Sequence, residues 1–427
     1  MTLQKTNAQN VFISTGNSLA VYIDATSEDL MLKDSNGVIQ PASDFISGAT
    51  GDFIKNQNAE AQNANFWLKG KATIGTSDYG FGTESLNIYG HLQITDEFEN
   101  VIIGNNGFMP IDGIASKNVG IGYGNLLANL YGFENIAIGN NNLASNDNGV
   151  SNIAIGSEVL YLNSLGNSNI GIGKVALNNN VTGSFNIAIA ETALFSNEQG
   201  NNNIALGIGS LYSNFNGGQN IALGNNSLYS NIEGFDNIAL GLDCLKSLTD
   251  GSYNIALGNS SLSNLATGDI NISLGISSLL NLNSGKGNIA IGGSALSNVD
   301  ESNNNIGIGM RALINTETIE ESIGIGFNVL QNVTEVNNSI VIGQNAISLG
   351  EVLANNIIAI GNNTHSNNFE NVLLLGHGAS ATIDNEICIG SATFPIGKIE
   401  SDSPTPDRTL QIKLNGEYYN ILMRKVV

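Results

Sequence analysis

The sequence predicts an all-β protein built as a parallel β-solenoid of the left-handed β-roll type. Its main basis is a consensus of seventeen residues, N-I-A-I-G-x-x-A/S-L-x-x-N-x-x-G-x-x, which recurs fourteen times between residues 118 and 343. Composition agrees, because the chain of 427 residues holds 51 Gly, one Trp and only 12% charged residues. A strict period identifies a repeat architecture, in which units stack on their neighbours. A unit this short has no room for two helices, so each repeat is predicted to be one coil of a β rod.

Each repeat divides into four predicted elements. The Ile-Ala-Ile run predicts a short strand, and the Gly after it predicts a bend. The small-Leu pair is interpreted as a second short strand, and an Asn/Gly-rich segment such as 129–132 as the turn that closes the coil. Each strand then pairs with the same strand one repeat later. At ~4.8 Å between neighbouring strands, fourteen coils give a rod about 65 Å long.

The first residue of each repeat is Asn in twelve successive coils, before Ser322 and Ser339 take the position. Stacking in register places these side chains in a ladder, where each amide can donate to the next. We therefore predict a structural role for the ladder, which comprises Asn118, Asn135, Asn152, Asn169, Asn186, Asn203, Asn220, Asn237, Asn254, Asn271, Asn288 and Asn305.

The Ile-Ala-Ile run has two apolar faces. Its two large side chains point to one side of the strand and the small residue points to the other. Sheets that are apolar on both faces are buried on both. One face is therefore expected to fill the coil and the other to pack on a partner, most economically further copies of the chain. The sequence leaves open which of the two columns faces that partner.

The N-terminal part of the chain divides into two predicted β modules. Residues 1–60 form a small module for attachment to a particle, with a hairpin candidate at 30–39 and Asn36-Gly37 in its turn. Residues 61–99 are rich in aromatic side chains and are predicted to cap the end coil, whose edge would otherwise be unpaired. The solenoid is predicted to span residues 100–392, and it begins with an irregular coil at Asn100–Gly104.

The C-terminal part departs from the period before it ends. The closing Gly residues fall at Gly361, Gly376 and Gly390, which shortens the coils from eighteen to fifteen and fourteen residues. Residues 393–427 are predicted to form a hairpin tip with Asn415-Gly416 at its turn. The aromatic and basic side chains at its end are the predicted receptor-binding residues: Tyr418, Tyr419, Arg424 and Lys425. Alternatively, this hairpin only caps the fibre or docks to a further tip protein.

The late coils carry a resemblance to a known family. Asn371-Val-Leu-Leu-Leu-Gly-His-Gly-Ala-Ser-Ala-Thr and Glu386-Ile-Cys-Ile-Gly-Ser resemble the head repeats of YadA-like trimeric autotransporter adhesins. Repeats of the same type cover about residues 100–392, although most coils here are three residues longer than the repeats of that family. It implies a left-handed β-roll in which three chains form one homotrimer. The chain shows no secretion signal and no C-terminal anchor, and its layout looks like a tail fibre of a phage or of a contractile injection system.

Charge and hydropathy narrow the expected partners and location. The net charge of −22 argues against nucleic acid as a partner, since phosphate binding needs a basic surface. The sequence contains no apolar run of eighteen residues, so no segment is predicted to span a membrane. Met1-Thr-Leu-Gln-Lys-Thr-Asn does not have the form of a signal peptide. We therefore expect synthesis in a cytoplasm and a final location in a virion or another extracellular particle.

No catalytic residue, cofactor site or metal site is predicted. Cys244 and Cys388 fall at positions of small packing residues, and the three His show no ligand spacing. Glycoside hydrolysis needs two carboxylates ~5–10 Å apart. The conceivable pairs are Glu233 with Asp250 and Glu320 with Glu321, but these acids are interpreted as solvated turn charges.

The sequence therefore predicts a non-enzymatic fibre or adhesin. Its partners would be two copies of itself, a baseplate or other particle protein at the N-terminal end, and a glycan or protein of the host surface. Two alternatives remain open: a tailspike that degrades polysaccharide, and a purely structural spacer or collar of a virion.

Overall fold

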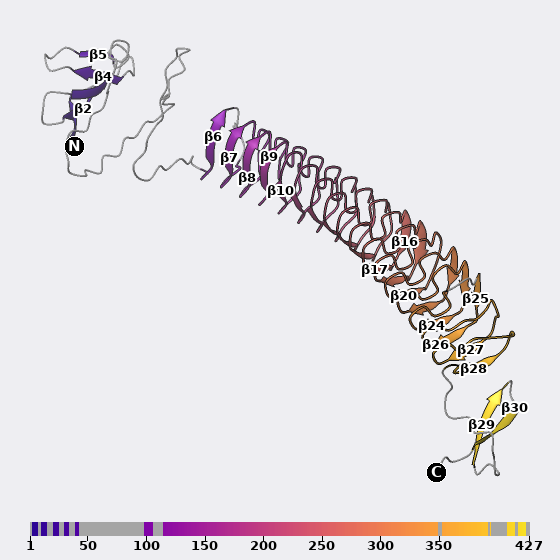
Figure 1. Cartoon of the computed structure of the whole chain (residues 1–427). Coiled ribbons are helices and arrows are strands. Elements are labelled where there is room, and N and C mark those ends of the chain that lie inside the picture. The colour runs from indigo at the N-terminus through magenta and orange to yellow at the C-terminus, as the bar shows by residue number, and fades with distance from the viewer. Residues whose placement is uncertain are drawn as a thin grey trace, which may run out of the picture. The chain divides into compact units, whose positions relative to one another are not determined.

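The computed structural model describes residues 98–105, 114–348, 352–391 and 393, together with the backbone of strands within 2–41 and 408–423 (Figure 1). The chain divides into a unit at Met1–Asn87 and a unit at Ile88–Val427. The described residues form strands and turns and contain no helix, so the prediction of an all-β protein is confirmed.

The first unit holds an antiparallel sheet in which the strands follow chain order. Pairing of the last two strands places Lys33 opposite Ile39, in agreement with the hairpin predicted at 30–39. The predicted turn residues Asn36 and Gly37 lie outside the described residues, as does most of the predicted cap at 61–99. The strands of this sheet are β1 (Thr2–Thr6), β2 (Asn10–Ser14), β3 (Ala20–Asp24), β4 (Leu30–Lys33) and β5 (Ile39–Pro41).

The second unit holds a parallel β-solenoid, as the repeat predicts. Each strand of its main sheet pairs in register with the equivalent strand of the next coil: Ile187 lies opposite Ile204, seventeen residues on (Figure 1). The main-sheet strands are β6 (Val101–Asn105), β7 (Val119–Tyr123), β8 (Ile136–Asn140), β9 (Ile153–Ser157), β10 (Ile170–Ile172), β11 (Ile187–Ile189), β12 (Ile204–Leu206), β13 (Ile221–Leu223), β14 (Ile238–Leu240), β15 (Ile255–Leu257), β17 (Ile272–Leu274), β19 (Ile289–Ile291), β20 (Ile306–Ile308), β22 (Ile323–Ile325), β24 (Ile340–Ile342), β26 (Ile358–Ile360), β27 (Leu373–Leu375) and β28 (Ile387–Ile389).

The coils at both ends of the ladder differ in length from the regular ones. At the start, Val101 pairs with Val119 eighteen residues on. At the other end, Ile340 pairs with Ile358, Ile358 with Leu373 and Leu373 with Ile387. These offsets of eighteen, fifteen and fourteen residues match the spacing of the closing Gly residues.

The small-Leu pair is a turn and not the predicted second strand. Its Leu adopts a left-handed backbone conformation, with φ of 51° at Leu177 and Leu194, for example. A left-handed residue costs about 1–2 kcal/mol, whereas full burial of a Leu side chain returns about 1.5–3 kcal/mol. The cost is tolerated because the sharp bend carries a fully buried Leu into the coil, while Leu177 N–H still donates to Ala193 O at 3.0 Å in the next coil.

The predicted Asn/Gly turn also changes along the rod. In the N-terminal coils a second Asn ladder clamps this segment, because each amide donates to the Gly carbonyl three residues on, as Asn197 does to Gly200 at 3.0 Å. From Leu248 onward the amide is replaced by aliphatic residues, except at Thr316, and the unclamped segment forms further parallel strands. The second Asn ladder comprises Asn129, Asn146, Asn163, Asn180, Asn197, Asn214 and Asn231. The added strands are β16 (Thr267–Asp269), β18 (Ser284–Lys286), β21 (Thr318–Glu320), β23 (Glu335–Asn337) and β25 (Leu353–Asn355).

The core is the interior of the coil. The small column of the main sheet and the Leu column face each other there, and both are buried, as at Ala188 and Leu194. The fit is tight: a Cβ added at Gly324 would lie 3.0 Å from Leu313 Cδ1. The column that contains Gly324 therefore faces inward, and where the coil allows it the column holds larger buried residues, Val341 and Leu374.

Near the C-terminus, β29 (Arg408–Leu414) and β30 (Glu417–Met423) form an antiparallel pair. Leu414 lies opposite Glu417, which is the pairing expected of the predicted hairpin.

Candidate functional site

Two surfaces of the solenoid stand out, and the first is apolar. We call it the Ile/Leu face: the outward side chains at the second and fourth positions of each repeat, on both sides of the buried small residue. Ala188 is fully buried, whereas its neighbour Ile189 is 36% exposed and Ile358 is 44% exposed. Within one chain, the small column therefore lies inside the coil and the large side chains remain at the surface. In the described coils this face keeps large apolar side chains partly exposed at the surface.

The first Asn ladder is fully buried and is a structural element. Each Asn donates Nδ2 to Oδ1 of the Asn one coil earlier, as Asn203 does to Asn186 at 3.1 Å. The same Nδ2 donates to a Gly carbonyl, here Gly217 O at 2.8 Å. The backbone N–H of Asn203 also donates to Asn186 Oδ1, at 2.9 Å. Every polar atom of the amide thus serves the stacking of the coils, and none is left for a ligand.

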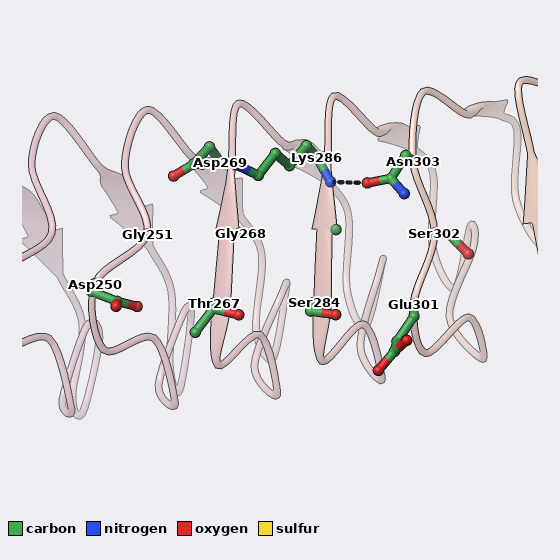
Figure 2. A pocket seen from close by; sticks show the side chains of 11 residues that line it. Asp250, Gly251, Thr267, Gly268, Asp269, Ser284, Lys286, Glu301, Ser302 and Asn303 are labelled. Carbon is green, nitrogen blue, oxygen red and sulfur yellow. Dashed lines mark hydrogen bonds and ion pairs between the residues drawn. The ribbon is translucent and has the colours of Figure 1, made fainter.

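The second surface is a polar groove of about 430 Å³ on the outer side of β16 and β18. Figure 2 shows two rows of side chains along it, each with one residue per coil. We call these the lower row and the upper row. The lower row holds Asp250, Thr267, Ser284 and Glu301; the upper row holds Asp269, Lys286 and Asn303.

Hydrogen bonds and an ion pair hold the upper row in place. Asp269 Oδ2 lies 2.8 Å from Lys286 Nζ, and Asp269 Oδ1 accepts a hydrogen bond of 3.0 Å from the backbone N–H of Ser252. Asn303 Oδ1 accepts a hydrogen bond of 3.0 Å from the backbone N–H of Lys286. The ion pair lowers the pKa of Asp269 and raises that of Lys286, so both groups are charged at neutral pH.

A second hollow of about 440 Å³ continues from the groove toward the C-terminus. It shares Lys286 and Asn303 with the groove and is also lined by Glu320 and Glu321. Of the acids interpreted as turn charges, Asp250 lines the groove, Glu320 and Glu321 line the second hollow, and Glu320 lies in strand β21. Glu233, which was weighed as a partner of Asp250, lies one coil earlier and does not line the groove.

A comparison with protein-family models, curated proteins and solved structures finds no match for this chain.

The two cysteines occupy different environments. Cys244 is fully buried beside the Leu column, and its Sγ lies 2.6 Å from Gly258 O. Cys388 is only partly buried because it lies in the last strand of the main sheet. Burial raises the pKa of both thiols to about 11, and Glu386 contributes at Cys388. The described residues contain no group of three His, Cys, Asp or Glu that could hold a metal ion.

The predicted receptor-binding residues fall in and after the C-terminal hairpin. Tyr418 and Tyr419 lie in β30, opposite Lys413 and Ile412. Arg424 and Lys425 lie outside the described residues. In the part of the chain that the structure describes, no helix has the length and apolar character needed to cross a membrane.

The groove was missed at the sequence level, although the sequence contains a signal for it. Polar residues recur at a spacing of seventeen in both rows, as in Asp250, Thr267, Ser284 and Glu301. Comparison of the same position in successive repeats, rather than of neighbours within one repeat, would have revealed both rows.

Proposed function

We propose that this protein is a homotrimeric, non-enzymatic fibre that attaches a phage or injection particle to a host cell surface. The observation that carries the proposal is the Ile/Leu face, which leaves Ile or Leu side chains at the surface in coil after coil. A single rod with such a face gains free energy by burying it, and identical chains offer each other a matching surface with the same coil spacing. In this proposal the solenoid supplies length and stiffness, while the two ends attach to the particle and to the host.

The mass of the protein in solution tests the assembly. The chain has a mass of 44.7 kDa, so light scattering should give about three times that value. Ile189→Asp adds a charge to the Ile/Leu face and should lower the mass of the assembly without unfolding the coil. Thr182→Asp adds the same charge on another exposed surface and should leave the mass unchanged. A wild-type protein that is a stable monomer would contradict the proposal.

Truncation tests the attachment. Removing residues 393–427 should leave a folded trimer that no longer adheres to host cells if Tyr418 and Tyr419 bind the receptor. Removing residues 1–60 should spare adhesion and prevent incorporation into the particle. Undiminished adhesion of a folded C-terminal truncation would move receptor binding to the rod.

A tailspike that cleaves polysaccharide is a second candidate, which the groove favours. Asp250 and Asp269 come from adjacent coils and flank the groove on opposite sides (Figure 2). The pair with Lys286 lowers the pKa of Asp269 and keeps this carboxylate ionised, whereas the reaction would also need a second carboxyl group that is protonated. Incubation of the protein with host envelope polysaccharides, scored for both binding and release of shorter chains, separates the adhesin from the tailspike.

A further inference from the structure

The lower row of the groove presents polar groups that no other part of the described chain engages. The side chains of Thr267, Ser284 and Glu301 line the groove and make no hydrogen bond to another described residue. They follow one another at one residue per coil, which is ~4.8 Å along the rod. Two hydroxyls and the carboxylate of Glu301 therefore face solvent with their hydrogen-bonding capacity unused, and at the other end of the row the carboxylate of Asp250 accepts one hydrogen bond of 3.1 Å, from Thr249 Oγ1.

The opposite side of the groove is already ordered. Asp269 and Asn303 are fixed by backbone N–H groups of the preceding coils, and Lys286 is fixed by its ion pair. A ligand that contacts the upper row would meet side chains that do not need to be immobilised first. Such preorganisation lowers the entropic cost of binding.

Three exposed apolar side chains belong to the first two coils of the groove or to the coil before them, although none of them lines the groove itself. Tyr253 is 60% exposed and directly follows Ser252, whose backbone N–H donates to Asp269. Ile270 is 61% exposed and directly follows Asp269. Phe235 is 41% exposed and occupies the upper-row position two coils before Asp269. Aromatic and aliphatic surfaces beside a few placed polar groups are the usual composition of a small-molecule site.

The charges of the groove select among ligand classes. Asp269 and Lys286 neutralise each other, which leaves the carboxylates of Asp250 and Glu301 in excess. This negative field repels anionic ligands. Sugar hydroxyls donate to carboxylates and hydroxyls, and the C–H faces of sugar rings pack on aromatic side chains. An uncharged saccharide therefore matches both the polar rows and the apolar side chains.

We propose that the groove between Asp250 and Asn303 binds an uncharged saccharide, which lies along the two rows in the direction of the rod. This site is on the solenoid and is separate from the C-terminal hairpin. It would give the rod a second contact with the host surface, besides that of the hairpin, and it rests on the proposed function only for this use of the binding.

An array of uncharged oligosaccharides, with galacturonate oligomers as the anionic comparison, tests the proposal on the full chain. It should cover α- and β-linked glucose, galactose, mannose and N-acetylglucosamine. We expect binding to at least one uncharged oligosaccharide and none to galacturonate. The double variant Thr267→Val with Ser284→Ala removes both free hydroxyls and should weaken binding about tenfold. Tyr253→Ala should weaken binding to a similar extent.

Thr182→Val is the matched control, because Thr182 is exposed at the equivalent position of a coil outside the groove. It should bind as the wild type does, and melting curves should show that all variants are folded. Failure of every uncharged oligosaccharide to bind, or wild-type binding by the double variant, would overturn the proposal. Loss of oligosaccharide binding with unchanged adhesion to cells would support the groove and contradict its use in attachment. Unchanged oligosaccharide binding by a chain that fails to adhere would contradict the proposed function alone.

Discussion

Replacing Asn186 by alanine should destabilise the rod more than any exposed substitution, because it interrupts the first Asn ladder in mid-course. Asn186 Oδ1 accepts hydrogen bonds from the backbone N–H and Nδ2 of Asn203, at 2.9 and 3.1 Å. Its Nδ2 donates to Asn169 Oδ1 at 3.2 Å and to Gly200 O at 2.8 Å. The amide is fully buried, so water cannot take over these bonds.

The magnitude follows from the groups that would be left unpaired. Asn203 Nδ2 retains Gly217 O, and Asn169 Oδ1 retains the backbone N–H of residue 186. Gly200 O retains the Nδ2 of Asn197 at 3.0 Å, so the backbone N–H of Asn203 is the group that loses its only partner. A buried polar group without a partner costs about 1–3 kcal/mol, so Asn186→Ala should cost about 1–3 kcal/mol.

Serine provides an internal comparison, because the chain uses it at this position in two later coils. Ser339 Oγ accepts from Ile357 N–H at 3.0 Å and donates to Ala354 O at 2.7 Å. Asn186→Ser keeps an acceptor and a donor and should cost about 1 kcal/mol. Asn264→Ala removes an exposed inter-coil amide bond of 3.1 Å to Asn281 and should cost less than about 0.5 kcal/mol.

Guanidinium unfolding midpoints and native-state hydrogen exchange of the coils on both sides of residue 186 would measure these losses. Exchange is the sharper readout, because a repeat array need not unfold in two states. The expected order of destabilisation is Asn186→Ala, then Asn186→Ser, then Asn264→Ala. Equal losses for the alanine and serine variants at residue 186 would refute the reasoning from unpaired backbone groups.

Three further predictions concern other parts of the solenoid. Ala154→Asp places a carboxylate inside the coil and should abolish cooperative melting, whereas Asp147→Ala at a partly exposed turn should shift the melting midpoint little. A thiol probe should label Cys388 before Cys244, because only Cys388 is partly exposed. Labelling of both should accelerate as the pH rises toward about 11, and faster labelling of Cys244 in the native protein would contradict its burial. The Asp269–Lys286 pair should stabilise the protein slightly above the ordinary pKa of Asp. That gain should disappear as the pH falls through the lowered pKa of Asp269, so wild type and Lys286→Met should melt alike in acid and differ at neutral pH.

The sequence predicted those parts of the fold that depend on period. The coil length, the main-sheet strands and the late change of coil length all follow from the spacing of Ile and Gly, and β6, β24 and β28 lie where that spacing puts them. The faces could not be assigned, because both columns of the strand are apolar. The packing of Leu313 against Gly324 shows that the small column faces the interior of the coil, and that contact between coils is not visible in the order of residues.

Two local predictions failed because tertiary packing overrode residue preference. Leu177 is bent into a left-handed turn by the requirement that its side chain fill the coil, although an alternating small-large pair favours a strand. The segment at Thr267–Asp269 forms a strand although its Gly favours a turn, since Leu265 has replaced the amide that clamps earlier coils. The groove was missed because the residues of each row become neighbours only when the coils stack, so the rows appear only when equivalent positions of successive repeats are compared.

The change of interior at Leu248 has a consequence for how such a chain finds its register. Nearly identical coils can exchange places, since a slip of seventeen residues would keep most strand contacts. Asn231 ends the second Asn ladder with an unpartnered Oδ1, and the next coil offers Leu248 in its place. Stacking in chain order contains one such junction, and pairing an Asn coil with a Leu coil at a second place would leave a further buried amide without a partner. The junction therefore distinguishes one coil from its neighbours in a repetitive molecule, whereas the inner coils of the second Asn ladder carry no such mark.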